Sequence, residues 1–358
     1  MNKKKFLSVV VLYWNDSKKT INCLESILKQ KKIKFTIILV DNNSDLKYTN
    51  NILNWLKKKK INFLRIKEYQ KIKNISSKIK LIYIKNKINY GCGLGHNPGY
   101  SFSIDKNFKY ISRIDNDMIL PNNLLYELSA KMEKNKNFIA MSPKVMFSDN
   151  RNLIWFRGAK IGNSLKFQKQ CANYKPGHED QKKYNGLINT DAIVGCASIM
   201  RTNILKKTGL SDPDFFYGEE DIELSHRFKK FNGKLKIDLD QKIYHSVSTT
   251  VGKNWAKNIY YNYKYRLLLI KKIGTFWDKF FGYSVPIIKL FISLFLIFNK
   301  KNSSKVIQRY FGLKHFFQGK YGEYDRVNYH SINNFFSKIS KKTNYLEVIK
   351  ILNSKTFR

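Results

Sequence analysis

Two carboxylates separated by one residue follow a short apolar segment in the middle of the chain. Residues 110–115 read YISRID, and Asn116 and Asp117 come next. Side chains two positions apart in an extended chain point to the same side, so Asp115 and Asp117 can bind one ion. Their oxygens suit Mg²⁺ or Mn²⁺, cations that usually share their coordination with substrate phosphate. Taken alone the pair is a weak signal, because Asp and Asn are also common in turns that end strands.

A cluster of acids opens a predicted helix at residues 220–231. Gly218 is followed by Glu219, Glu220 and Asp221. Neighbouring carboxylates raise one another's pKa, which is what a general base near neutral pH requires. The helix dipole also favours acids in a first turn, so the cluster has a purely structural interpretation as well.

A single histidine, His245, follows a strand-like segment that ends at Tyr244. Imidazole suits Mn²⁺ better than Mg²⁺, so His245 is a candidate metal ligand. The structural alternative is a histidine packed in the core.

Residues 89–99 are rich in glycine. Gly91, Gly93 and Gly95 do not have the GxGxxG spacing, and the first strand–helix turn has no glycine. This excludes a nicotinamide-dependent oxidoreductase. We expect these glycines to let the backbone approach a ligand closely.

Alternating strands and helices must position these residues. Continuous apolar character is typical of strands buried in a parallel sheet, and it occurs at 6–14, 35–40, 81–84 and 110–115. Helical spacing follows at 17–31, with Ser17 as N-cap, at 49–60 and at 122–134. This order predicts a three-layer α/β domain with a mostly parallel central sheet. Ligands bind beyond the carboxyl ends of such strands, where this chain has Asp16, Asp41 and Asp115.

Two segments do not follow this alternation. Residues 61–80 are basic and of low complexity, and we interpret them as an insertion whose structure the pattern does not predict. From about residue 253 the sequence is aromatic, basic and helical in pattern, which predicts a helical C-terminal extension.

The chain is strongly basic. Its 358 residues include 67 Lys or Arg against 26 Asp or Glu, and the hydrophobic content of 43% excludes a disordered chain. The charge predicts polyanionic partners: nucleic acid, an acidic membrane or nucleotide-linked substrates. The excess is mostly Lys, whereas Arg reads phosphates and bases bidentately, so no specific nucleic-acid partner is predicted.

Cysteine usage and the N-terminus indicate a cytoplasmic protein. The four cysteines form no CxxC pair, which predicts free thiols in a reducing compartment. The brief apolar run at the N-terminus is followed by polar NDSKKT, so a buried first strand is favoured over a signal peptide.

The most apolar run covers residues 285–298 and contains Lys289, so it is too short for a membrane span. It lies between basic segments. We expect it to bind peripherally at the inner face of the cell membrane, on an anionic surface, with these side chains among the acyl chains: Phe291, Leu294, Phe295 and Phe298. A core helix or a dimer interface is the alternative, and the oligomeric state is not predicted.

Segments spread over residues 7–270 resemble, in order, the motifs of glycosyltransferase family 2, which has the GT-A fold, and particularly its rhamnosyltransferase-like branch. They are SVVVLYWND, INCLESILKQ, IILVDNNSD, NYGCGLGHNPGY, RIDNDM, DAIVGCASIMRTNILKKTGLSDPDFFYGEEDIELSHRF, IYHSVSTTVG and YYNYKYRLLLIKK. The resemblance implies an inverting transfer of one sugar from a UDP- or dTDP-linked donor to a hydroxyl of a lipid-linked surface glycan. It implies a transferase domain at 1–252, with a nucleotide-sugar half to about residue 120 and an acceptor half from 121, followed by an extension at 253–358.

The resemblance also assigns roles to residues. The donor would be bound by Tyr13, Asn15, Asp41, Asn43, Asn89, Gly91, Gly95, Asn97 and Asp115. Mg²⁺ or Mn²⁺ would be held by Asp115, Asp117 and His245. Asp221 would be the general base, with Glu220 as the alternative. The acceptor would be bound by Gly195, Cys196 and Glu219.

Some features depart from the family pattern. The extra acid at Glu219 leaves the position of the base open by one residue, and Ser211-Asp212-Pro213 replaces the usual Phe-Asp-Glu. The chain has no Arg-Trp dipeptide, which favours a single-addition enzyme over a processive one. Two alternatives are a nucleic-acid or acidic-surface binding protein, supported by the charge and by 22 Tyr and 25 Phe, and an inactive relative that serves as a scaffold.

Overall fold

Strand β1 (Leu7–Tyr13) is buried on both sides, because its side chains alternate between two cores. Val9 and Val11 pack in one apolar cluster, and Val10 and Leu12 pack in the other. The prediction of a buried first strand is confirmed. The strand belongs to the first of two compact units, residues 1–247 and 248–358, in a computed structural model that describes residues 6–162, 178–246, 255–294 and 300–323.

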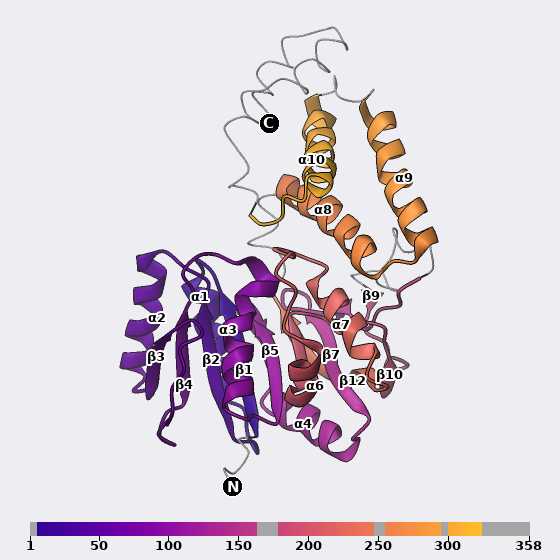
Figure 1. Ribbon diagram of the computed structural model, residues 1–358. Helices are drawn as coiled ribbons and strands as arrows, with labels where there is room; N and C mark the ends of the chain where they lie inside the picture. The colour runs from indigo at the N-terminus through magenta and orange to yellow at the C-terminus, as the bar shows by residue number, and fades with distance from the viewer. Residues whose placement is uncertain (1–5, 163–177, 247–254, 295–299, 324–358) are drawn as a thin grey trace. The chain divides into compact units, whose positions relative to one another are not determined.

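The described part of the first unit is built around one mixed sheet of 12 strands (Figure 1). After β1 these are β2 Phe35–Asp41, β3 Phe63–Lys67, β4 Leu81–Lys85, β5 Tyr110–Asp115, β6 Met118–Ile119, β7 Phe138–Phe147, β8 Leu153–Phe156, β9 His178–Glu179, β10 Leu187–Asn189, β11 Ala197–Arg201 and β12 Lys234–His245. Their main order is β10-β12-β7-β11-β5-β1-β2-β4-β3. The part from β5 to β3 is parallel, and β11 runs antiparallel between β5 and β7.

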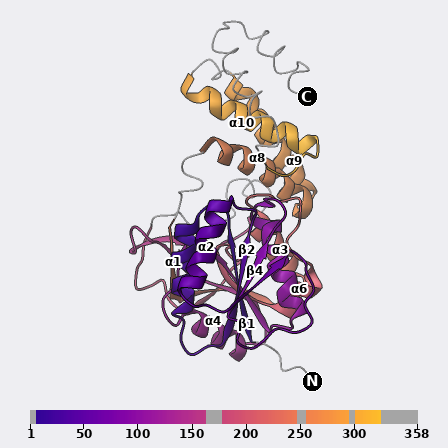
Figure 2. The same cartoon turned by 90° about the vertical axis from the view of Figure 1, so that its left-hand side faces the viewer.

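Helices cover both faces of this sheet. They are α1 Ser17–Leu28, α2 Leu46–Lys58, α3 Gly91–Asp105, α4 Leu124–Lys134, α6 Thr202–Thr208 and α7 Glu220–Lys229. Figure 2 shows α1, α2 and α4 on one face and α3 and α6 on the other. The two apolar clusters follow this division, since Leu24 and Ile52 belong to the first and Tyr100 and Leu224 to the second. The predicted three-layer α/β architecture is confirmed, but the sheet is mixed and the expected mostly parallel arrangement is not exact, because β11 and also β6, β8, β9 and β10 form antiparallel pairs.

One local prediction needs correction, and one segment whose structure the sequence left open contains a strand. The N-cap of α1 is Asp16, whose Oδ1 accepts from the Lys19 N–H at 3.0 Å, and Ser17 is the first helical residue. Residues 61–80 include strand β3, which pairs in parallel with β4 and buries Ile66. The surrounding lysines conceal this strand, because an edge strand needs few apolar positions.

The second unit contains α8 Trp255–Ile273, α9 Phe276–Leu294 and α10 Lys300–Phe317, and α8 contacts both other helices. The predicted helical extension is confirmed for this part of the chain. The expected domain boundary at residue 252 lies outside the described residues. None of the helices described is both long enough and apolar enough to cross a membrane.

Candidate active site

The turns that follow β1 and β2 are tied together at the carboxyl edge of the sheet. The Asn15 N–H donates to Ser44 Oγ at 3.0 Å, and the Asp45 N–H donates to Asn15 Oδ1 at 2.8 Å. Asn15 and Asn43 both have left-handed backbones, with φ of 51° and 63°, which Asn tolerates better than most residues. These two predicted donor-binding residues therefore lie in one joined pair of turns, where Asn43 is exposed.

Tyr13 and Asp41, two further predicted donor-binding residues, are buried beneath these turns. Asp41 accepts from the Ser44 N–H and from Thr49 Oγ1, each at 2.7 Å. The Tyr83 hydroxyl also donates to Asp41 and lies 3.0 Å from the Tyr13 hydroxyl. Burial and the charge of Asp41 raise the pKa of Tyr83, so this hydroxyl stays protonated. Tyr13 and Asp41 thus shape the turns from inside and do not face solvent.

The glycine-rich segment starts α3 and packs against other parts of the protein. The Cys92 N–H donates to Phe216 O at 2.7 Å. Gly91 has a φ of +76°, and a Cβ there would lie 1.9 Å from Phe216 O. Gly95 is buried beside Asn42. These glycines let α3 approach neighbouring protein segments, and contact of their backbone with a ligand stays a prediction.

Side-chain amides fix the same segment from two sides. Asn42 Nδ2 donates to Asn89 Oδ1 at 2.8 Å, which joins the β2 turn to the start of α3. Asn97 clamps the main chain of Ser211, donating to its carbonyl at 2.9 Å and accepting from its N–H at 3.0 Å. Both groups of the buried Asn97 amide are therefore used inside the protein.

Replacing Gly91 by alanine should destabilise the protein by about 1–3 kcal/mol from the strained backbone alone, and by more because the new Cβ meets Phe216 O. Gly186→Ala is the matched control, since Gly186 has the same φ of +76° but open space around it. Urea unfolding of both variants measures the difference. Equal losses of stability in the two variants would show that the close approach to Phe216 does not limit which residue can occupy position 91.

Asp117 and His245 are brought together from the β5–β6 turn and the end of β12. Asp117 Oδ1 lies 3.3 Å from His245 Nε2, and the histidine ring packs edge-on against Trp155. Asp115 lies beside them, with its Oδ1 3.8 Å from His96 Nε2. Burial raises the pKa of Asp115 to about 6, against the opposing charge of a neighbouring arginine.

That neighbour, Arg113, connects the strand of Asp115 to the acids of α7. Its Nη2 lies 3.0 Å from Glu220 Oε1, and its Nε lies 3.7 Å from Asp115 Oδ1. A Cβ on Gly195 would lie 2.9 Å from Arg113 Cζ, so only glycine leaves room for the guanidinium. The Gly195 N–H in turn donates to Asp221 Oδ2 at 2.9 Å. One buried arginine and one glycine thus join both groups of predicted acids.

Glu220 and Asp221 are adjacent but have different surroundings. Glu220 is buried and paired with Arg113, whereas Asp221 is half-buried and accepts from the Gly195 N–H. Burial, followed by the charge of Glu220, raises the pKa of Asp221 to about 7. A carboxyl group that titrates near neutral pH can accept a proton from a reacting group.

The predicted acceptor-binding residues differ in exposure. Gly195 and Cys196 are buried, and the Cys196 carbonyl accepts from the Asp115 N–H at 2.8 Å. Glu219 is half-buried and left-handed, with a φ of 68°, directly before α7. Gly195 and Cys196 therefore connect β5 to the acids, and Glu219 is the member of the set that reaches the surface.

A family model described as glycosyl transferase family 2 matches residues 8–209, more than half of the chain. The chain belongs to glycosyl transferase family 2. The solved structure of GalNAc-T7 with UDP, GalNAc and Mn²⁺ is similar over 68% of this chain and 44% of that chain, with 16% identity and a TM-score of 0.51. The structure of S. aureus TarS matches over 80% of this chain and 43% of that chain, with 14% identity and a TM-score of 0.47. A comparison with curated protein sequences finds no match.

The chain spans less than half the length of either solved protein. The likeness to GalNAc-T7 concerns the fold, and together with the family it confirms the predicted GT-A-like architecture.

The side chains at the carboxyl edge include oxygen and nitrogen atoms that suit a divalent cation which a ligand also coordinates. Asp117 and His245 offer an oxygen and a nitrogen 3.3 Å apart, and Asp115 offers a second carboxylate beside them. In the part of the chain that the structure describes, no three His, Cys, Asp or Glu side chains group closely enough to hold a metal ion. Phosphate oxygens of a bound nucleotide would complete the coordination.

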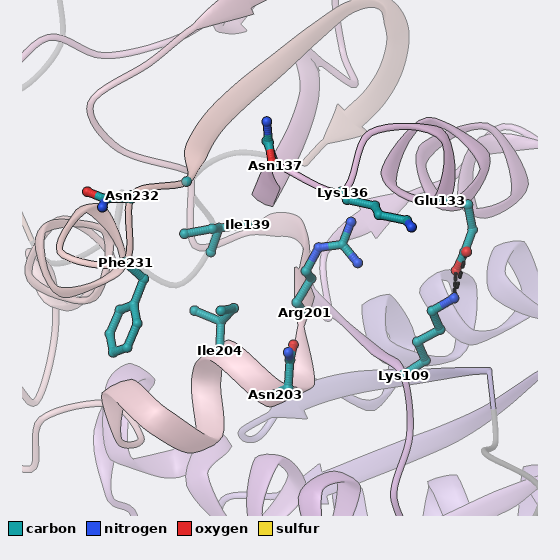
Figure 3. Close-up of a pocket in the computed structure, with 11 residues that line it drawn as sticks. Lys109, Glu133, Lys136, Asn137, Ile139, Arg201, Asn203, Ile204, Phe231 and Asn232 are labelled. Carbon is teal, nitrogen blue, oxygen red and sulfur yellow. Dashed lines mark hydrogen bonds and ion pairs between the residues drawn. The ribbon is translucent and has the colours of Figure 1, made fainter.

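A cavity of about 380 Å³ lies at the opposite end of the sheet, where β5, β7 and β12 begin (Figure 3). Its Lys109 lies 2.6 Å from Glu133, and its Arg201 donates to Phe138 O and Met132 O, each at 2.7 Å. These groups already bind one another, and the family-2 acids are not among the lining residues. We therefore assign the candidate site to the carboxyl edge.

Trp14 lies between the predicted donor-binding residues Tyr13 and Asn15, and its side chain is 40% exposed. Two other residues of this edge, Asn42 and Arg113, were missed by sequence reasoning. Asn42 and Arg113 are buried and act through residues far away in sequence, so spacing alone gives no signal for them.

Proposed function

We propose that the chain transfers one sugar from a nucleotide diphosphate donor to an acceptor hydroxyl, with inversion at the sugar carbon. The observation that carries this proposal is the position of Asp221, whose pKa of about 7 suits a general base and whose carboxylate is linked through Gly195 and Arg113 to the strand of Asp115. A single in-line displacement needs a base but no covalent nucleophile, and it inverts the configuration.

Asp221 is the better candidate for the base. Glu220 is buried, its Oε1 forms an ion pair with Arg113, which is always charged, and its Oε2 is enclosed in the protein away from solvent. Asp221 is partly open to solvent and can accept the proton of an acceptor hydroxyl. Glu219 lies beside it at the surface and would contact the acceptor.

A divalent cation, Mg²⁺ or Mn²⁺, would be held by Asp117 and His245 together with phosphate oxygens of the donor, and Asp115 would have to move closer to become the third protein ligand. When bound, the cation would neutralise the charge that develops on the leaving diphosphate. The nucleoside would be held by the exposed side chain of Trp14 and by Asn15 and Asn43. The buried Tyr13 and Asp41 would support these turns from inside the protein.

The finer assignments rest on the family resemblance. We propose the rhamnosyltransferase-like branch, a UDP- or dTDP-linked donor and a lipid-linked surface glycan as acceptor. The transferase domain would cover residues 1–252, and the protein would work in the cytoplasm at the inner face of the cell membrane. A panel of UDP- and dTDP-sugars with Mn²⁺, scored by nucleotide release with and without glycan acceptors, tests this. No release with any donor, together with binding of random single-stranded DNA, would support the alternative of a nucleic-acid binding protein.

The pH dependence tests the base assignment. Only the ionised Asp221 accepts a proton, so kcat/KM should rise about tenfold per pH unit below pH 7 and level off above it. Asp115 ionises at lower pH, with a pKa raised to about 6, so it is charged over the upper part of this range. The rates are measured from pH 5.5 to 9 with saturating Mn²⁺. A rate that falls as the pH rises through 7 would contradict the assignment.

A further inference from the structure

Helix α9 exposes large apolar side chains along its length. Six of them are exposed by between 55% and 73%: Phe276, Trp277, Phe280, Ile288, Phe291 and Ile292. At roughly 100° per residue, these positions fall within one arc of the helix about 160° wide. We name these six residues the α9 face.

The opposite side of α9 packs inside the helical unit. Gly282 approaches α8 so closely that a Cβ there would lie 2.9 Å from Ile270, and Pro286 is buried. Asp278 is buried as well, and its Oδ2 accepts from the Thr275 N–H at 2.9 Å. The core of this unit thus covers one side of α9, and within the described residues of the unit the α9 face is the side left without apolar cover.

The helical unit that carries the α9 face is strongly basic. Residues 253–323 contain 14 Lys or Arg, of which Lys264 is buried, and two Asp or Glu, of which Asp278 is buried. Lys271, Lys272 and Lys289 are exposed before and on the helix. A partner for this surface must therefore combine apolar groups with negative charge.

The positive charge of the helical unit disfavours two partners for the α9 face: a second copy of the protein and the C-terminal residues 324–358. A second copy would bring an equally basic helical unit against this one. The C-terminal residues 324–358 have seven Lys or Arg against two Asp or Glu, so they too would be repelled. An anionic bilayer offers acyl chains and acidic headgroups together.

We propose that the α9 face binds an anionic lipid membrane, with α9 lying in the plane of the bilayer surface. Its aromatic and isoleucine side chains enter the acyl region while the lysines contact acidic headgroups. This moves the contact toward the start of α9, compared with the residues expected from sequence. Of those, Phe291 is on the face, whereas the Leu294 side chain, Phe295 and Phe298 lie outside the described residues. The binding is independent of the proposed sugar transfer.

The test is flotation of the full-length protein with phosphatidylcholine vesicles, with and without 30% phosphatidylglycerol, at 50 and 500 mM NaCl. The protein should float with the anionic vesicles at low salt, and several-fold less with neutral vesicles or at high salt. Phe280→Ser/Phe291→Ser should reduce the bound fraction at least tenfold. The matched control Leu46→Ser/Tyr69→Ser removes two apolar side chains exposed elsewhere and should float like the wild type.

Each other result overturns the proposal. Flotation of the Phe280→Ser/Phe291→Ser variant at the wild-type level would remove the role of the α9 face. Absence of flotation in the wild type would also overturn the proposal. Light scattering and melting curves would then show which part of the protein covers the α9 face. A dimer that the variant dissociates indicates a second copy, and a lower melting temperature of the variant indicates residues 324–358. Asp221→Asn should float normally, so a failure of the proposed catalysis does not affect this result.

Discussion

Replacing Asp221 by asparagine should lower kcat by about 10²–10⁴-fold, because the amide cannot accept the proton of the acceptor hydroxyl. The side chain keeps its shape, and its remaining oxygen can still accept from the Gly195 N–H. Binding of donor nucleotide with Mn²⁺, measured by calorimetry, should therefore be unchanged. Initial rates at saturating donor measure the loss. A higher KM for the donor with normal kcat would make Asp221 a binding residue.

Glu220→Gln is the informative comparison for this variant. Breaking a buried ion pair by removing one charge leaves the other uncompensated, which costs about 3–5 kcal/mol in comparable cases. The variant should therefore melt at a lower temperature, because Arg113 keeps its charge inside the protein and retains only the more distant Asp115, 3.7 Å from its Nε, as an ion-pair partner. Its remaining activity below the melting transition should exceed that of Asp221→Asn. A stable, inactive Glu220→Gln enzyme beside an active Asp221→Asn enzyme would move the base by one residue.

The carboxyl edge could be predicted from sequence because it depends on local patterns. Apolar runs such as β1 and β2 identify buried parallel strands, and the polar residues that follow them then meet at one edge. The position of β11 could not be predicted, because it is inserted antiparallel between β5 and β7 by contacts between distant segments. Strand β3 was missed for a different reason, since its five residues, FLRIK, are a short apolar pattern between segments rich in lysine.

The site divides in the same way. The spacing of Asp115 and Asp117 reveals a possible ion site because both acids lie in one turn. Arg113 is invisible to such reasoning, because its partner Glu220 is 107 residues away. Gly91 and Asn97 are predicted to bind the donor, which stays a prediction, and the structure adds that Gly91 packs against Phe216 and that the Asn97 amide binds the main chain of Ser211. A conspicuous motif indicates that few residue types fit a segment. The contacts and burial of the segment are needed to tell whether this restriction comes from packing or from a ligand.

Replacing Asp117 by alanine should lower turnover by at least about 10²-fold, the loss typical when a group that stabilises transition-state charge is removed. Asp117 Oδ1 is 3.3 Å from His245 Nε2. The substitution therefore removes one of two adjacent candidate metal ligands and leaves His245 Nε2 without its carboxylate partner. The fold should survive, since the side chain is at the edge and partly exposed. Asp115→Ala should have a smaller effect on metal binding, because Asp115 lies toward Arg113 and His96.

The measurement is a Mn²⁺ titration of activity, together with calorimetric titration of Mn²⁺ in the presence of UDP. Asp149→Ala is the control, because it removes an exposed acid nearby that is outside the site. In Asp117→Ala both the activity and the calorimetric midpoint should move to higher Mn²⁺ concentration, whereas the control should match the wild type. Normal turnover of Asp117→Ala, or full activity of the wild type in excess chelator, would show that the paired carboxylates serve the fold. Because Asp117 contacts His245 at the end of β12, a structural role alone would lower the melting temperature and leave the Mn²⁺ midpoint unchanged.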